Sequence, residues 1–293
     1  MPPLPRVPPL LLASLLLLLP LPACMPPSPA ADQLAWHSQR LSALRAEDGW
    51  LTLVGLDFLP DGSHTIGNCG SATFSYANCA DPIVGRLDVT GDTVRFTPDG
   101  SNGSTLLTAD DAGAPSVIRS GPVSFTLVRR NGRLALRVKD NASLVRTGFT
   151  GIELFPFDAA LVVQARALPS AQGERIAITN VRGFIEEQPV AAILEFSLGG
   201  APRRFVATAG SNGRLFVVFA DQTNGGETYG GGRFLDLPAP KNGDVTIDFN
   251  KSYNPPCSFT AFATCPLPPD QNRLALPIRG GERASRASDS ASH

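Results

Sequence analysis

Alternating hydrophobic and polar residues dominate the chain from Gly49 onward. Runs such as VSFTLVRR (123–130) and RLALRVKD (133–140) place apolar side chains at every second position. This period of two is typical of strands that bury one face. The same pattern predicts strands over 50–56, 85–90, 92–98, 104–110, 123–130, 133–140, 160–168, 191–198, 203–209, 214–220, 233–237 and 245–249.

Turn signals separate these runs at short intervals. Asn-Gly pairs occupy 131–132, 212–213 and 242–243, and Asn-Gly between two alternating runs is a strong hairpin signal. A dozen short strands with such turns indicate a mainly β fold. We therefore predict a single antiparallel β-sandwich or barrel-like domain over residues 32–279, followed by a disordered tail over 280–293.

One segment before the strands has helical periodicity. Residues 32–47 (DQLAWHSQRLSALRAE) begin with Asp32, a residue suited to capping, and place Leu34, His37, Leu41 and Leu44 on one stripe. The pattern predicts one N-terminal helix. We interpret His37 on this stripe as a packed side chain rather than a ligand for a metal.

The first residues resemble an export signal. An apolar, proline-containing run is followed by LPAC at 21–24, which is similar to the lipidation signal of a bacterial lipoprotein. This interpretation makes residues 1–23 a signal peptide, Cys24 a lipidated N-terminus and residues 24–31 a tether. A plain secretory signal cut near Ala30 is the alternative. Either way we expect the bacterial cell envelope, facing the periplasm, with membrane contact through the N-terminal lipid only.

Four cysteines remain after Cys24. Their proximity along the chain favours the pairs Cys69–Cys79 and Cys257–Cys265, in keeping with an oxidising compartment. Four cysteines also permit two other connectivities. A four-thiolate metal site is the competing interpretation, but the tight C-x-x-C spacing of zinc sites is missing. We expect no metal and no cofactor.

Composition narrows the classes of partner. The formal net charge is −1, so no long-range field attracts nucleic acid, and we predict no nucleic-acid role. The sequence lacks G-x-S-x-G, S-x-x-K, H-E-x-x-H and P-loop motifs. Any catalysis would therefore rely on carboxylates, and a small-molecule ligand is the expected partner.

Candidate site residues gather toward the C-terminus. If the strands 214–220, 233–237 and 245–249 form an antiparallel meander, their alternate ends share one edge of the sheet. That edge would lie beside a glycine-rich loop (225–232) and the proline-rich stretch 248–274, which we expect to be rigid. The candidate ligand-binding residues are Asp221, Glu227, Tyr229, Arg233, Asp248, Asn250 and Asn254.

Several interpretations of this cluster stay open. It could be purely structural, with Arg233 in a cross-strand ion pair with Asp221 or Asp248. It could bind a small polar or sugar-like molecule, which is our first hypothesis. It could also be the site of a carboxylate-dependent hydrolase of an envelope component, using Asp221, Glu227 and Asp248. A scaffold protein without a pocket is the remaining alternative.

Three segments carry a family resemblance. They are GWLTLVGLDFLPDGSHTIG (49–67), DQTNGGETYGGGRFLDLP (221–238) and DFNKSYNPPCSFTAFATCPLPPDQNRLALPI (248–278). Together they resemble the bacterial family called domain of unknown function 1684, over about Trp36 to Glu282. This resemblance implies no activity, substrate or cofactor. Cys69 and Cys79 lie in a stretch outside the family pattern, so their pairing rests on the expected compartment alone.

Overall fold

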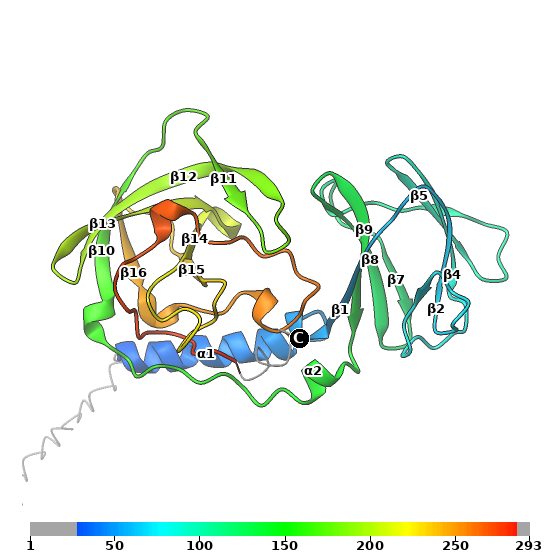
Figure 1. Cartoon of the computed structure of the whole chain (residues 1–293), viewed down its shortest axis with the longest axis horizontal. Helices are drawn as coiled ribbons and strands as arrows, with labels where there is room; N and C mark the ends of the chain where they lie inside the picture. Colours follow the sequence, from blue (N-terminus) through cyan, green and yellow to red (C-terminus); the bar gives the residue numbers. More distant parts are fainter. Residues whose placement is uncertain (1–27, 286–293) are drawn as a thin grey trace, which may run out of the picture.

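The computed structural model describes residues 28–285 and consists of two β lobes joined side by side (Figure 1). We call them the sandwich lobe, which contains β1 to β9, and the half-barrel lobe, which contains β10 to β16. The predicted signal peptide, the tether before residue 28 and the lipidation site Cys24 lie outside the described residues. The mainly β fold with one N-terminal helix is confirmed.

The sandwich lobe packs two sheets against each other. One sheet has the order β1-β9-β8-β7 and the other β3-β2-β4-β5-β6. All neighbouring strands are antiparallel except the short parallel pair β2–β3. The strands are β1 Leu53–Phe58, β2 Gly62–Gly67, β3 Phe74–Ser75, β4 Gly85–Thr90, β5 Thr93–Pro98, β6 Thr105–Leu106, β7 Val117–Ser120, β8 Val123–Arg130 and β9 Arg133–Asp140.

The half-barrel lobe is one curled, seven-stranded sheet. Its order is β15-β14-β13-β12-β10-β16, with β11 paired to the far part of β12. After β16 the chain returns to the opposite edge, where Phe234 and Tyr253 exchange both backbone hydrogen bonds. The strands are β10 Val162–Leu168, β11 Arg175–Thr179, β12 Ile185–Leu198, β13 Ala201–Ala209, β14 Leu215–Phe219, β15 Arg233–Leu237 and β16 Asp244–Asp248.

Each lobe has its own hydrophobic core, and smaller clusters fill the junction. Phe205, Phe219 and Phe249 are fully buried at the centre of the half-barrel. The junction contains a cluster in which Leu53 of β1 packs with Val218 and Phe234 of the other lobe. The lobes are therefore held together by buried apolar contacts as well as by the covalent chain that passes between them.

The N-terminal helix α1 (Pro29–Arg45) runs beneath the half-barrel toward the sandwich lobe (Figure 1). Its cap is Ser28, whose hydroxyl accepts from Ala31 N, so the expectation that Asp32 caps the helix is wrong. Leu34, which we placed on the buried stripe, is 63% exposed. Leu44 of the same stripe is fully buried, as predicted. The helix also docks through Gln33 and Arg40, whose polar contacts a hydrophobic pattern does not predict.

The remaining helices are short. Helix α2 (Leu144–Thr147) follows β9 and stands at the junction of the lobes. Single 3-10 turns cover η1 Trp50–Thr52, η2 Ala159–Leu161, η3 Ser211–Gly213, η4 Phe249–Lys251, η5 Pro256–Ser258 and η6 Asp270–Asn272.

The predicted three-stranded meander is only half correct. β14 and β15 pair antiparallel, with Phe219 opposite Arg233, but β16 pairs with β10. Asn242 has the positive φ expected of its turn. The turn therefore forms, but β15 and β16 on either side of it do not pair with each other. Pro238 and Pro240 precede that turn and cannot donate ladder hydrogen bonds, which disfavours a β15–β16 hairpin.

The C-terminal residues 280–285, which we expected in a disordered tail, are packed against the half-barrel. Glu282 is fully buried, and its backbone N donates to Ser252 O at 2.8 Å. Within residues 28–285, no helix combines the length and apolar character needed to cross a bilayer.

Candidate functional site

The expected neighbours Asp221 and Arg233 do meet, in a fully buried ion pair. Arg233 Nη2 donates to Asp221 Oδ2 at 2.6 Å and to Ile278 O at 2.7 Å, while Nη1 donates to Gly280 O at 2.6 Å. Asp221 Oδ1 accepts from the backbone and hydroxyl of Thr223 and from Ile278 N. We call these five residues the Asp221 cluster.

Burial dominates the electrostatics of this cluster. Desolvation lowers the pKa of Arg233, although the Asp221 carboxylate opposes that shift. The guanidinium carbon lies 5.1 Å from the centre of the Phe219 ring. The hydrogen bonds from Arg233 to Ile278 O and Gly280 O, and from Ile278 N to Asp221, tie the C-terminal chain to the start of β15 and to the residues after β14. The cluster therefore fastens the C-terminus to the sheet.

Asp248 does not join the cluster; its strand β16 pairs with β10 and not with β15. Its carboxylate caps η4 by accepting from Asn250 N and Nδ2, each at 3.0 Å. The Asn250 side chain also exchanges hydrogen bonds with the Asp158 backbone at 2.9 Å. These two predicted site residues hold the end of β16 against the chain that enters β10.

Asn254 belongs to a second buried network. Its backbone N donates to Glu282 Oε2 at 2.7 Å, and its Nδ2 donates to Arg283 O at 2.7 Å. Arg40 of α1 reaches the same place, donating to Asn254 O at 2.8 Å and to Glu282 Oε1 at 3.3 Å. Burial raises the pKa of Glu282 despite the nearby guanidinium. This network fixes α1 to the C-terminal chain.

Glu227 and Tyr229 complete the set of candidates. Glu227 pairs with Arg279 at 2.9 Å, and this hydrogen bond lowers the pKa of the carboxyl. Tyr229 is half-buried, and desolvation is the main cause that raises its pKa to about 12. The carboxylates proposed for catalysis thus each bind a different protein partner. None of the seven candidates lines the groove at the junction of the lobes.

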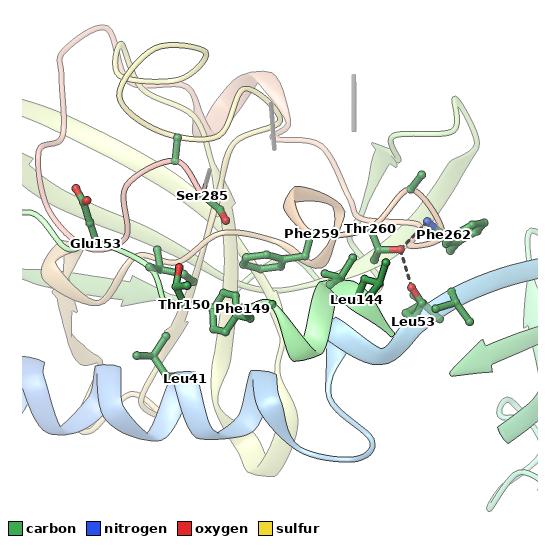
Figure 2. Close-up of a pocket in the computed structure, with 17 residues that line it drawn as sticks. Leu41, Leu53, Leu144, Phe149, Thr150, Glu153, Phe259, Thr260, Phe262 and Ser285 are labelled. Carbon is green, nitrogen blue, oxygen red and sulfur yellow. Dashed lines mark hydrogen bonds between the residues drawn. The ribbon is translucent and has the colours of Figure 1, made fainter. Parts of the chain in front are cut away.

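A groove of about 1010 Å³ lies at the junction of the lobes. We call it the interlobe groove. Its walls come from α1, β1, α2, the connection from α2 toward β10, the loop after η5 and the C-terminal chain (Figure 2). The lining residues are Leu41, Leu53, Val54, Leu144, Val145, Gly148, Phe149, Thr150, Gly151, Ile152, Glu153, Phe259, Thr260, Ala261, Phe262, Ala284 and Ser285.

The groove is lined by apolar, aromatic and polar groups, with somewhat more apolar than polar surface. The Phe149 and Phe259 rings meet edge to face with centroids 6.2 Å apart. Leu144 is 88% exposed and Phe262 is 38% exposed, so apolar surface extends to the rim. Glu153 and Ser285 lie at the end away from Phe262 (Figure 2). A groove of this composition suits a ligand with an apolar face and a few polar groups.

Two basic residues and one histidine stand around the groove. The Arg45 guanidinium lies 5.0 Å from the Phe149 ring centre, and Arg283 approaches Glu153 at 4.0 Å. His37, half-buried on α1 as expected, has a pKa lowered first by desolvation and then by Arg40, and it contacts the backbone of Ile152. Among residues 28–285, no group of three or more His, Cys, Asp or Glu is arranged to hold a metal ion.

All four described cysteines are free thiols in the structure. The Cys257 and Cys265 backbones each donate to the sulfur of the other residue, at 3.1 and 3.3 Å. Cys69 Sγ instead contacts Ser71 Oγ at 3.1 Å, and Cys79 lies beside Ser120. Both disulfides stay predictions. Cys257 and Cys265 are already in contact in the structure, whereas Cys69 and Cys79 contact serines.

Sequence reasoning missed the groove residues altogether. Phe149 lies in a segment without periodicity, and Phe259 and Phe262 lie in the proline-rich stretch, where we looked for polar groups. One signal was available in FTAF (259–262), two aromatic residues in an irregular segment between two cysteines. Apolar side chains in an irregular loop indicate either packing or a binding surface.

Comparisons with known proteins found a matching family model and a similar solved structure. Residues 147–283 match the family model described as protein of unknown function (DUF1684), which confirms the predicted resemblance over that segment. A solution NMR structure of an uncharacterized protein from Haloarcula marismortui is 30% identical, covers 47% of this chain and 78% of that chain, and has a TM-score of 0.40. No match was found among curated proteins.

Proposed function

We propose that this chain, whose residues 147–283 match the DUF1684 family, is an exported ligand-binding protein whose site is the interlobe groove. The groove itself is the observation that carries the proposal. Its volume of about 1010 Å³ is at the upper end of the range for small-molecule sites, and such sites favour the junction of two packed units.

The lining favours a sugar-like ligand over a small, wholly polar one. Phe149 and Phe262 offer exposed ring surface to the C–H faces of a sugar ring, and Phe259 packs behind Phe149. Thr150, Glu153 and Ser285 supply polar groups at the other end of the groove. The Asp221 cluster supports ligand binding less well, because its buried charges are already hydrogen bonded to protein groups.

A thermal-shift screen with monosaccharides, disaccharides and aryl glycosides tests the proposal. Thr150 is an exposed lining residue, so Thr150→Trp should obstruct the groove without disturbing the core. Thr93→Trp is the matched control, on the exposed turn of the β4–β5 hairpin. We expect at least one glycoside to stabilise the protein and the Thr93 variant, but not the Thr150 variant. Stabilisation that survives in the Thr150 variant, or its absence across the panel, would contradict the proposal.

Attachment to the envelope is the second part of the proposal. The LPAC segment ending in Cys24 supports a lipid anchor. Expressed in a bacterium that processes lipoproteins, the protein should enter the detergent phase, and Cys24→Ser should move it to the aqueous phase. A soluble mature protein with a free N-terminus near Ala31 would rule out the anchor.

A further inference from the structure

One wall of the interlobe groove is a loop bounded by two cysteines. Phe259, Thr260, Ala261 and Phe262 line the groove, and all four lie between Cys257 and Cys265. The loop crosses from the half-barrel lobe to the sandwich lobe, where Thr260 Oγ1 donates to Leu53 O at 3.0 Å. The position of this wall therefore depends on how firmly the base of the loop is closed.

The base is closed by the reciprocal N–H···S hydrogen bonds between Cys257 and Cys265. For each backbone N–H to reach the sulfur of the other residue, the two residues must lie side by side. The thiols also contact each other: hydrogen bonding with Cys265 is the main cause that lowers the pKa of Cys257, and the same contact raises the pKa of Cys265. Cys257 is the more exposed of the two.

We propose that Cys257 and Cys265 form a disulfide that fixes this wall of the interlobe groove, so that the rigidity of the site depends on the redox state of the pair. The disulfide itself requires only the contact between the thiols. Its consequence for a ligand rests on the proposed function of the groove.

The oxidant is a compound or protein that itself contains a disulfide. The Cys257 thiolate attacks one sulfur of that disulfide and forms a mixed disulfide, releasing one thiolate of the oxidant. The Cys265 thiolate then attacks Cys257 Sγ and displaces the second thiolate. The protein loses two electrons and two protons, and the oxidant becomes two thiols. The accessible Cys257 reacts first, and the buried Cys265 resolves the intermediate.

The other two cysteines give an internal comparison. Cys69 is half-exposed and contacts the Ser71 hydroxyl, and Cys79 is buried beside Ser120. A disulfide between them would require both sulfurs to leave these serines. Under mild oxidation the Cys257–Cys265 bond should therefore form first.

Oxidised glutathione added to the mature full chain tests the proposal, read out by unreduced peptide mapping and by hydrogen exchange over 258–264. We expect a Cys257–Cys265 crosslink and severalfold slower exchange in the oxidised protein than after reduction. Cys257→Ser should exchange at the fast rate under both conditions, and Cys69→Ser should behave like the unaltered chain. Melting curves establish that both variants are folded.

Two results would overturn the proposal. Free thiols at Cys257 and Cys265 after oxidation would refute the disulfide, and a crosslink without slower exchange at 258–264 would refute the effect on the groove wall. Neither readout uses a ligand. A groove that binds no glycoside would therefore contradict the proposed function and leave this inference standing.

Discussion

The Asp221 cluster and the interlobe groove lie in the same chain and use side chains in opposite ways. The cluster gathers charged groups, buries them fully and bonds them to one another and to backbone carbonyls, with only Arg233 Nε left without a partner among the atoms of this pair. The groove gathers apolar and aromatic groups and leaves part of them exposed. The polar Asp221 cluster thus stabilises the fold, while the partly exposed interlobe groove offers the space for a ligand.

The largest effect separating the two regions is expected at Arg233. Arg233→Ala leaves the Asp221 carboxylate buried without its cation, so unfolding should become easier by about 3–5 kcal/mol. Arg279→Ala is the matched control, because it removes an exposed guanidinium that pairs with Glu227, and it should leave the unfolding midpoint unchanged. Denaturant titration measures both. An Arg233 variant of normal stability that fails to bind a ligand would make the cluster the binding site.

The next effect comes from the groove wall. Closing the loop from Cys257 to Cys265 should stabilise the folded state by about 2.5 kcal/mol through the entropy of the unfolded chain. Oxidised and reduced protein can be compared by denaturant unfolding. The difference should disappear in Cys257→Ser. Equal stabilities of the two forms would mean that the bond strains the native loop as much as it restricts the unfolded chain.

A smaller effect should appear as pH dependence at Glu282. Burial raises its folded-state pKa above the ordinary value of 4.5, so the folded protein holds this proton more tightly than the unfolded chain. The contribution to stability is present below pH 4.5 and is lost as pH rises through the folded-state pKa. Stability should therefore fall less steeply above pH 4.5 in Glu282→Gln than in the unaltered protein. Parallel curves would contradict the assignment.

Glu227 provides the opposite case. Its pKa is lowered by the hydrogen bond from Arg279, so its contribution is present above pH 4.5 and is lost as pH falls through the folded-state value. In Glu227→Gln, stability should depend less steeply on pH below 4.5, while the slope above 4.5 should match that of the unaltered protein; equal slopes below 4.5 in acid unfolding curves would contradict this assignment.

The smallest effect on stability is expected at the rim of the groove. Leu144 lines the groove and is 88% exposed, so Leu144→Ala should change the free energy of unfolding by no more than about 0.5 kcal/mol while weakening glycoside binding severalfold. Thermal melts and a glycoside titration of the same sample measure both quantities. Unchanged glycoside binding would show that the rim of the groove does not contact the ligand.

Much of the fold was predictable because strand alternation and turn chemistry are local. Asn131, Asn212 and Asn242 all have the positive φ that their Asn-Gly turns require. The pairing of Asp221 with Arg233 followed from the antiparallel register of β14 and β15. The placement of Asp248 failed because the curl of the sheet, which moves β16 to β10, is set by packing across the whole lobe.

The groove was not predictable from pattern. Its lining extends from Leu41 to Ser285 and comes from segments that meet only through the packing of two lobes. The same is true of the docking of α1, where Arg40 finds Glu282 242 positions away. Neither helical nor strand periodicity contains information on such distant contacts.

A crystal structure of the protein soaked with phenyl β-glucoside tests the central claim most directly. This probe has an aromatic ring, a sugar ring and no charge, so it can use both ends of the groove without forming an ion pair. We predict density along the groove beside the Phe149 ring, with the phenyl group toward Phe262 and the sugar toward Glu153. Density beside Arg233 or Tyr229 instead, or an empty groove at saturating probe, would contradict the claim that the interlobe groove is the ligand site.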